Sequence, residues 1–239
     1  MLIPKLPSLS LLIATLSILT PTLANTEKAI FIAPPPSPNT AQHPSLSPWY
    51  LTSLPTLTPS NFSIRTHLAS QFPSSLSPGS ESWYLLDDLN PDQRYEVRVC
   101  WAATQPTSFT LTTYSIPQVL EEPDLVTSLA HYEISHTPSA EEDGKERGDF
   151  ETKESSKLLL RVVTAADYFT DDEKLMKHPE PVHVDLILDP FLYNVLPRSL
   201  APTVMYIAAL VPVAWIVARW VSGRMVSVAK AGAETKKEK

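Results

Sequence analysis

The chain has 239 residues with 24 prolines, five glycines and one cysteine, and its formal net charge is −7. The few glycines form no phosphate-binding loop, and one cysteine excludes both an intramolecular disulfide framework and a cysteine-rich zinc module. The acidic balance argues against a general nucleic-acid binder, and a hydrophobic share of 43% is too high for a wholly disordered chain.

The first 24 residues have the layout of a secretory signal peptide. Lys5 precedes an apolar run over residues 9–19, and the small residues Thr22 and Ala24 follow it. The run is too short to span a bilayer core of about 30 Å as a helix. We therefore predict a signal peptide at 1–24 that is cleaved after Ala24, with an uncleaved anchor or a buried strand as alternatives.

A second apolar run, residues 202–221, is long enough to form a transmembrane helix. It holds one charged residue, Arg219 near its end, and it holds Pro212 near its middle, where a kink is expected. A soluble amphipathic helix would show a polar face, and this run shows none. Basic residues follow the run, so we predict a basic cytosolic tail at 222–239 and a lumenal domain at 25–201.

Each side of this predicted span carries a short motif that suits the topology. Lys236 and Lys237 stand fourth and third from the C-terminus, where a dilysine signal for retrieval to the endoplasmic reticulum is read. The alternative is a solvated charge run that anchors the helix end. On the lumenal side, Asn61 opens the only N-glycosylation sequon of the chain. These features predict a single-pass type I protein of the endoplasmic reticulum membrane with a cytosolic C-terminus.

The predicted lumenal part is mainly β, a β-sandwich-like domain with proline-rich loops. Prolines recur through residues 33–80 and exclude helices and central strands there. A charged stretch at 139–156 is predicted to be a mobile loop, and Thr170 to Glu173 predict one capped helical turn. Alternating and β-rich segments predict seven short strands, at 28–32, 61–68, 82–86, 95–101, 108–116, 158–163 and 182–188.

One of these strands and the turn before it resemble the tyrosine corner of fibronectin type III domains. The residues that carry this resemblance are Leu89, Pro91, Tyr95, Val97 and Val99. In that family a tyrosine hydroxyl bonds back to the backbone near the corner and fixes the sandwich edge. Cys100 alternates with the inward set, so we expect it on the opposite face of the sheet. A packed small residue is favoured there over an intermolecular disulfide or a reactive thiol.

No group of residues in the sequence predicts a catalytic or metal centre. His178 and His183 flank a carboxylate, but the prolines between them prevent a helix and the spacing matches no zinc pattern. Asp87 and Asp88 are typical of solvated turn residues, and no nucleophile elbow accompanies the serines. We therefore expect a protein that is not an enzyme and that needs no metal and no cofactor.

The segment between the last predicted strand and the span is apolar and rich in proline. It enters the span without the polar linker that a receptor on a stalk would have. Within the span, Pro212 and Arg219 are expected to pack against protein, because kinked and polar positions in membranes often do. We expect five residues of the segment at the lumenal membrane surface or against a partner protein: Phe191, Leu192, Tyr193, Val195 and Leu196.

Residues 25–34, 95–101 and 188–200 carry a resemblance that extends over most of 25–221. Together with the signal peptide, single span and dilysine tail, they resemble the fungal coactivator subunit of GPI mannosyltransferase II. The resemblance implies a non-catalytic, stabilising partner of a polytopic transferase that adds the second mannose to GPI precursors. The catalytic partner would use dolichol-phosphate mannose as donor. Two alternatives stay open, a fibronectin-like type I receptor or adhesion molecule and a lumenal hydrolase or glycan-binding protein.

Overall fold

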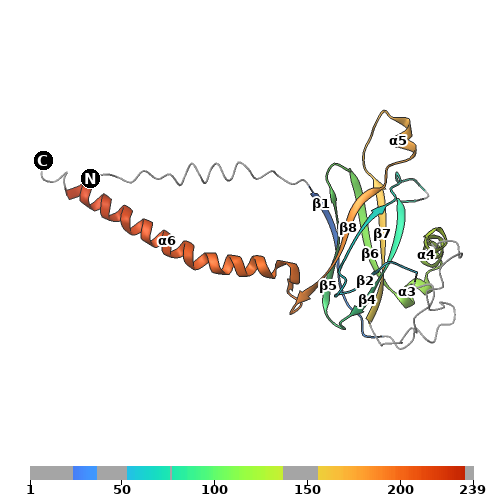
Figure 1. Cartoon of the computed structure of the whole chain (residues 1–239), viewed down its shortest axis with the longest axis horizontal. Helices are drawn as coiled ribbons and strands as arrows, with labels where there is room; N and C mark the ends of the chain where they lie inside the picture. Colours follow the sequence, from blue (N-terminus) through green and yellow to red (C-terminus); the bar gives the residue numbers. More distant parts are fainter. Residues whose placement is uncertain (1–23, 37–52, 76, 137–155, 235–239) are drawn as a thin grey trace.

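The computed structural model describes residues 24–36, 53–75, 77–136 and 156–234, with side chains up to residue 227. These residues form two packed β-sheets and one long C-terminal helix (Figure 1). The predicted fold class, a mainly β sandwich with one C-terminal apolar helix, is thereby confirmed. The predicted signal peptide lies outside the described residues except for Ala24, and the predicted loop at 139–156 except for Ser156.

Each sheet is built from strands that are distant in the sequence. Sheet A has the order β1 (Ala24–Ile32), β5 (Arg94–Ala102), β8 (Val182–Leu192), β3 (Ser63–Leu68), with the short β9 (Leu196–Pro197) paired to β8. Sheet B has the order β2 (Thr56–Leu57), β4 (Ser80–Leu89), β7 (Ser156–Ala166), β6 (Thr107–Ser115). Every strand pair is antiparallel except β2 with β4. All seven predicted strands are present, with bounds shifted by a few residues.

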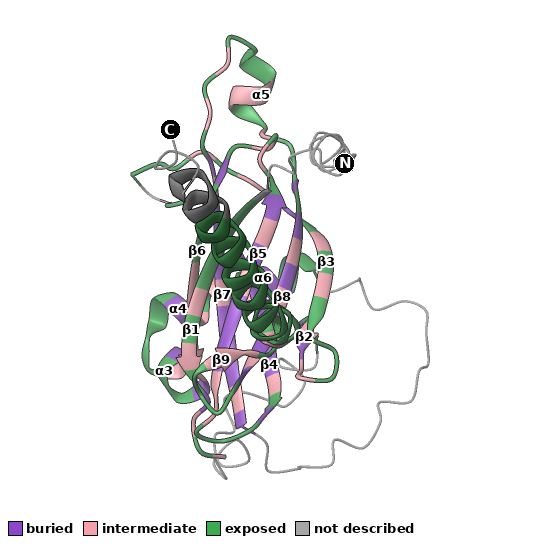
Figure 2. Cartoon of the chain, turned by 90° about the vertical axis from the view of Figure 1, so that its left-hand side faces the viewer, coloured by how far each residue is buried: buried purple, intermediate pink, exposed green. Residues whose placement is uncertain are grey.

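The hydrophobic core lies between the two sheets. Figure 2 colours the buried residues along the strands purple. Alternate residues of the strands point into it because successive side chains of a strand face opposite ways. Fully buried members include Val97, Val99, Leu160, Leu186 and Leu188. Burying such side chains stabilises the domain by about 1.5–3 kcal/mol each before the entropy cost of folding.

The predicted tyrosine corner is confirmed at the start of β5. The Tyr95 hydroxyl accepts a hydrogen bond from the backbone N–H of Asn90 at 2.9 Å. The same hydroxyl donates to the Gln93 side-chain oxygen at 3.0 Å. The ring is fully buried and stacks on Phe31 of β1, with ring centroids 5.8 Å apart. The corner therefore joins the β4–β5 turn to the core.

Two helices that the sequence analysis did not predict cover the outer face of sheet B. α3 (Ile116–Glu121) begins with a capping box between Ser115 and Gln118, and α4 (Pro123–His136) follows directly. Leu125, Leu129 and Tyr132 of α4 are buried in a second apolar cluster with Trp83 and Leu159 of sheet B. Their spacing is that of one helix face, a sequence signal that would have predicted α4.

The predicted helical turn is α5 (Glu173–Lys177), and Asp172 caps it by accepting a hydrogen bond from the Lys174 N–H at 2.8 Å. The final helix, α6 (Ala201–Glu234), continues from the 3₁₀ turn η2 (Arg198–Leu200) and contains Pro212. It projects away from the sandwich as a separate rod (Figure 1). Among the described residues it is the one helix long and apolar enough to cross a membrane, over Arg198–Ser227.

The corner generates a test of the fold. Tyr95→Phe removes the hydroxyl that binds the Asn90 N–H and Gln93, so we expect the sandwich to lose about 1 kcal/mol of unfolding free energy. This corresponds to a fall in Tm of about 2–4 °C, measured by thermal unfolding of the full chain in detergent. Tyr206→Phe removes a hydroxyl from an exposed residue of α6 and serves as the control with no expected change. Equal Tm values for the two variants would contradict the role of the corner.

Candidate functional site: a juxtamembrane surface

The β8–β9 hairpin forms a sharp turn immediately before η2 and α6. The backbone N–H of Val195 donates to the Leu192 carbonyl at 3.1 Å, and Tyr193 and Asn194 between them have φ of 52° and 58°. Positive φ at both central residues defines a type I′ turn. Asparagine tolerates this conformation, whereas for tyrosine it is uncommon and costs about 1 kcal/mol or more. The backbone of Tyr193 is thus strained, and the contacts of the neighbouring Asn194 hold the turn in this conformation.

Polar contacts attach this hairpin to the β4–β5 turn. The Asn194 side-chain oxygen accepts from the Arg94 N–H at 2.8 Å, and its Nδ2 donates to the Asp92 carbonyl at 3.0 Å. Gln93 Nε2 donates to the Phe191 carbonyl at 3.0 Å. These contacts join two turns that are 100 residues apart in the sequence.

The hairpin presents an exposed aromatic and aliphatic tip. Tyr193 is 98% exposed, and Leu192 and Val195 are also exposed. Phe191 differs from the expectation of surface contact, because it is only 6% exposed. The Arg94 guanidinium lies 5.8 Å from the centre of its ring. Phe191 therefore supports the tip from below, and the exposed surface begins at Leu192.

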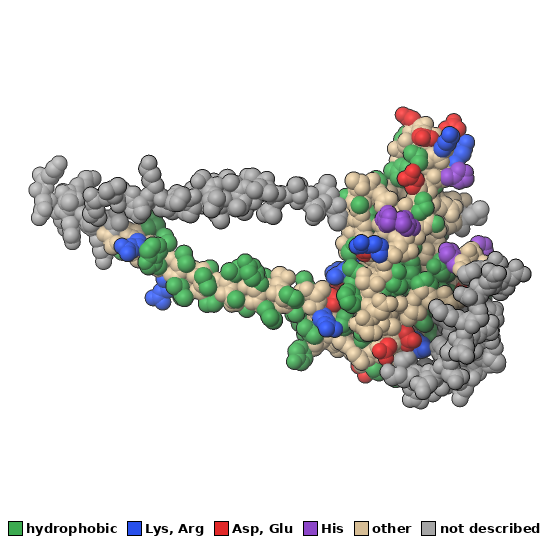
Figure 3. All heavy atoms as spheres, viewed as in Figure 1, with side chains coloured by type: hydrophobic (Ala, Val, Ile, Leu, Met, Phe, Trp, Pro, Cys, Tyr) green, Lys and Arg blue, Asp and Glu red, His purple; other side chains and the backbone are tan. Residues whose placement is uncertain are grey.

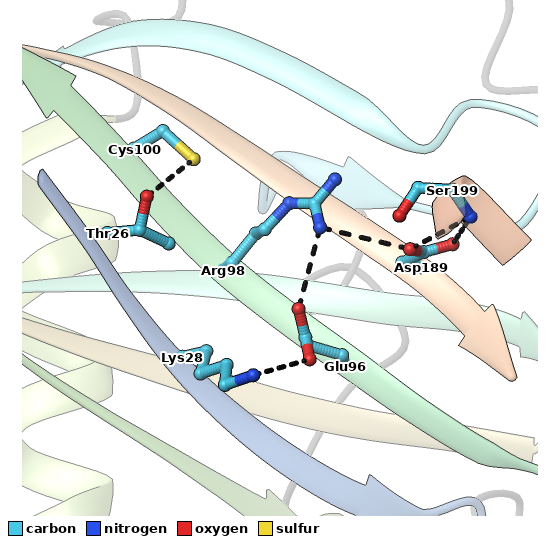
Figure 4. A network of polar contacts seen from close by, with 7 residues as sticks. All are labelled: Thr26, Lys28, Glu96, Arg98, Cys100, Asp189 and Ser199. Carbon is cyan, nitrogen blue, oxygen red and sulfur yellow. Dashed lines mark hydrogen bonds and ion pairs between the residues drawn. The ribbon is translucent and has the colours of Figure 1, made fainter. Parts of the chain in front are cut away.

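A network of charged side chains lies beside the hairpin on the outer face of sheet A (Figure 4). Glu96 of β5 and Asp189 of β8 face each other across the strand pair and are each 5% exposed. Lys28 Nζ lies 3.2 Å from Glu96 Oε2, and Arg98 Nη1 lies 3.5 Å from Glu96 Oε1 and 3.9 Å from Asp189 Oδ2. Two cations thus balance two carboxylates whose burial would otherwise be costly.

Asp189 also connects this network to the C-terminal helix. Both of its carboxylate oxygens accept hydrogen bonds from the backbone N–H of Ser199, at 3.2 and 3.3 Å. Ser199 lies in η2, the first turn that leads into α6. The first N–H groups of a helix lack partners within the helix and carry partial positive charge, so a carboxylate stabilises them. Asp189 therefore caps the turn η2 and ties the residues that lead into α6 to the sheet.

This network was not predicted from the sequence. Its members come from β1, β5 and β8, which are far apart in the chain, and each charged residue alone is typical of a solvated strand face. The available signal was the alternation of Glu96 and Arg98 with the inward residues of β5, which places both on one face. Predicting that they lie beside Asp189 would also have required knowing that β5 and β8 are neighbours in the sheet.

Helix α6 exposes apolar side chains on all sides within its described part. The Arg219 guanidinium lies 5.8 Å from the Trp215 ring centre, and Arg224 lies 5.4 Å from that of Trp220. Figure 3 shows the hydrophobic side chains along the rod and the two basic residues toward its far end. An apolar surface of this length is typical of a helix covered by lipid or by other membrane helices.

Asn61, the predicted glycan site, is exposed in a turn before β3. Its backbone N–H donates to Thr58 Oγ1 at 2.9 Å, and its carbonyl accepts from the Thr58 N–H at 3.1 Å. The side chain is thus presented from a defined turn. Lys236 and Lys237, the predicted retrieval residues, lie outside the described residues.

His183, which was considered together with His178 from the sequence, lies against His67 of the neighbouring strand. The two rings pack across β3 and β8, with centroids 3.6 Å apart. Beside them Arg65 Nε donates to Asp185 Oδ1 at 2.7 Å, and this hydrogen bond lowers the pKa of the Asp185 carboxyl. The described part of the chain contains no group of three or more His, Cys, Asp or Glu residues that could hold a metal ion.

Cys100 is half-buried on the outer face of sheet A, opposite to the inward valines, as expected from its place in the strand. The Thr26 hydroxyl of the neighbouring β1 donates to its Sγ at 3.5 Å (Figure 4). The thiol therefore lies on the same face as the charged network.

Comparison with known proteins gives one family. The model of the Pga1 family, described as GPI-mannosyltransferase II co-activator, matches residues 16–220. No curated protein and no solved structure matches the chain. The matched residues include both sheets, the β8–β9 hairpin and the apolar part of α6.

The cap generates a test of this site. Asp189→Ala leaves the Ser199 N–H and the half-buried Arg98 without this carboxylate, so we expect a loss of about 2 kcal/mol in unfolding free energy. Asp189→Asn keeps an acceptor for Ser199 but removes the charge, and a smaller loss is expected. Chemical denaturation of the full chain in detergent measures both. Glu173→Ala, which removes an exposed carboxylate, is the control; a loss at Asp189 no greater than at Glu173 would contradict the capping role.

Proposed function

Because the chain belongs to the family of GPI-mannosyltransferase II co-activators, we propose that it is a non-catalytic subunit that binds and stabilises the catalytic subunit of this enzyme. The description of the family as a co-activator implies that its members act together with a mannosyltransferase. We place the complex in the endoplasmic reticulum membrane, with a polytopic catalytic partner that adds the second mannose of GPI precursors. The family match over residues 16–220 carries this proposal.

A folded β-sandwich joined to one apolar helix suits a subunit that supports a catalytic partner. Transfer from a lipid-linked sugar donor takes place at the membrane and needs an acceptor site with acidic groups close to the bilayer. A co-activator needs a folded face, a helix that packs in the membrane and residence in the same compartment. The Asp189 cap supports the proposal because it holds the sandwich at a set position on the helix that enters the membrane.

Two parts of the chain are proposed to contact the catalytic subunit. Within the bilayer, Pro212 and Arg219 mark the side of α6 that packs against partner helices, because polar and kinked positions are favoured at such interfaces. At the bilayer surface, Leu192 and Tyr193 of the hairpin tip meet the partner's exposed loops. The strained backbone of Tyr193 supports this assignment, since such conformations cluster at functional positions.

We further propose a type I orientation in the endoplasmic reticulum. The sandwich lies in the lumen, where Asn61 carries an N-linked glycan, and the basic tail with Lys236 and Lys237 lies in the cytosol and retrieves the protein. The basic residues that follow the apolar part of α6 support the orientation. The exposed turn at Asn61 supports glycan attachment.

Co-purification tests the partnership. We expect the tagged full-length chain, extracted in mild detergent, to carry a multispanning mannosyltransferase subunit with it. Tyr193→Ala should reduce the recovered partner several-fold while leaving the Tm of the chain unchanged, because the ring is almost fully exposed. Phe169→Ala, at another highly exposed aromatic residue near α5, is the matched control and should recover the partner in full. A wild-type chain that purifies alone would overturn the proposal.

Orientation and residence are tested together. Enzymatic deglycosylation should increase the gel mobility of the wild type and have no effect on Asn61→Gln, because the only sequon then lacks its asparagine.

Replacing both Lys236 and Lys237 with serine should move the protein from the endoplasmic reticulum to later compartments, as seen by fluorescence microscopy. The tag must leave the C-terminus free. An unmodified wild type would count against lumenal glycosylation, and an unmoved double variant would count against retrieval.

A further inference from the structure

The outer face of the edge strand β1 carries exposed apolar side chains, where a solvent-facing sheet surface usually carries polar ones. Ala29 and Phe31 pack against the core, so the residues between them point outward. Thr26 and Lys28 are the polar residues expected on an outer face, but Ile30 and Ile32 follow them and are 53% and 58% exposed. Scattered exposed aliphatic residues are common, yet these two are neighbours on one strand.

The outer face of sheet A is turned toward the side from which α6 leaves the domain. Figure 1 shows α6 on the opposite side of the sandwich from α3 and α4. Figure 2, viewed from the α6 side, shows this helix projecting over the sheet that contains β1, β5, β8 and β3. A membrane crossed by α6 therefore faces the outer surface of sheet A.

The connection to the span sets how far this face stands from the bilayer. Ser199 is hydrogen-bonded to Asp189 in the face, and the apolar run begins at Pro202. Three helical residues rise about 4.5 Å. The headgroup layer on each side of a bilayer core is about 5–7 Å thick. The network around Asp189 is thus at the depth of the lipid headgroups once α6 is inserted.

The chemistry of the face suits phospholipid headgroups. Ile32 pairs with Arg94 across the β1–β5 ladder, so an aliphatic and a basic side chain lie next to each other. Ile30 pairs with Glu96, whose charge Lys28 and Arg98 balance. Basic groups attract lipid phosphates, and aliphatic groups beside them bury into the boundary between headgroups and acyl chains. The Arg94 guanidinium lies 5.8 Å from the ring centre of Phe191, at the base of the hairpin.

We propose that the outer face of sheet A lies on the lumenal leaflet, with Ile30 and Ile32 inserted between phospholipid headgroups and Arg94 contacting their phosphates. The proposal rests on the membrane insertion of α6 proposed above and is independent of the catalytic partner. A sheet held flat on the leaflet by β1 at one edge and by the capped helix at another point cannot rotate freely about α6. It would present Tyr193 to the catalytic subunit in one direction.

The experiment measures the depth of single spin labels in the full chain. The chain is reconstituted without any catalytic subunit into vesicles of phosphatidylcholine and phosphatidylserine, in a Cys100→Ser background. Ile32→Cys carries the nitroxide on the proposed lipid face. Ile134→Cys, on the exposed surface of α4, is the aqueous control, and Val211→Cys in α6 is the bilayer control. Collision of each label with oxygen, which concentrates in bilayers, is compared with collision with a water-soluble nickel chelate.

The expected result is an oxygen-to-nickel collision ratio for Ile32→Cys that is several-fold above that of Ile134→Cys and below that of Val211→Cys. A ratio equal to that of Ile134→Cys, with a bilayer-like value at Val211→Cys, would overturn the lipid contact and leave the span intact. Protection of Ile32→Cys that develops only after the catalytic subunit is added would overturn it in favour of a protein contact. A water-like value at Val211→Cys would remove the membrane insertion on which the proposal rests.

Discussion

The bond between the Asp189 carboxylate and the Ser199 N–H is the constraint on which the arrangement of this protein depends. The β8–β9 pairing ends at Pro197, and this bond attaches the next turn, η2, to the sheet before α6 begins. A carboxylate at this depth is stable only because Arg98 lies beside it and Glu96 and Lys28 complete the charge balance. The charged network therefore stabilises the buried carboxylate that binds Ser199, two residues before α6 begins.

A join between the sheet and the turn before α6 suits the role proposed for a chain of the co-activator family. If α6 crosses the membrane as proposed, the surfaces near its start lie at the depth of the headgroups. The β8–β9 hairpin and the outer face of sheet A are the two such surfaces. One presents an exposed tyrosine in a strained turn and the other a pair of isoleucines beside arginine, so the proposed protein and lipid contacts fall on separate surfaces.

Local patterns predicted the strands well, because alternation along a strand reports burial on one face. Tyr95, Val97 and Val99 were predicted to point inward and are buried, and the tyrosine corner was predicted from the turn before them. The helices α3 and α4 were missed although the spacing of Leu125, Leu129 and Tyr132 was available. Phe191 was expected at the surface, but it is buried on the outer face of sheet A, where its strand pairs with β9 and the Arg94 guanidinium lies over its ring.

By itself the sequence determined that this protein is a mainly β domain followed by one apolar helix of membrane length, because hydrophobic period and run length are local properties. It also pointed to the co-activator family. Only the tertiary structure decided that Lys28, Glu96, Arg98 and Asp189 form one network, and that this network caps the helix start. The reason is strand order: β1, β5 and β8 are adjacent in space through pairings between distant segments, and no local pattern encodes which strand pairs with which.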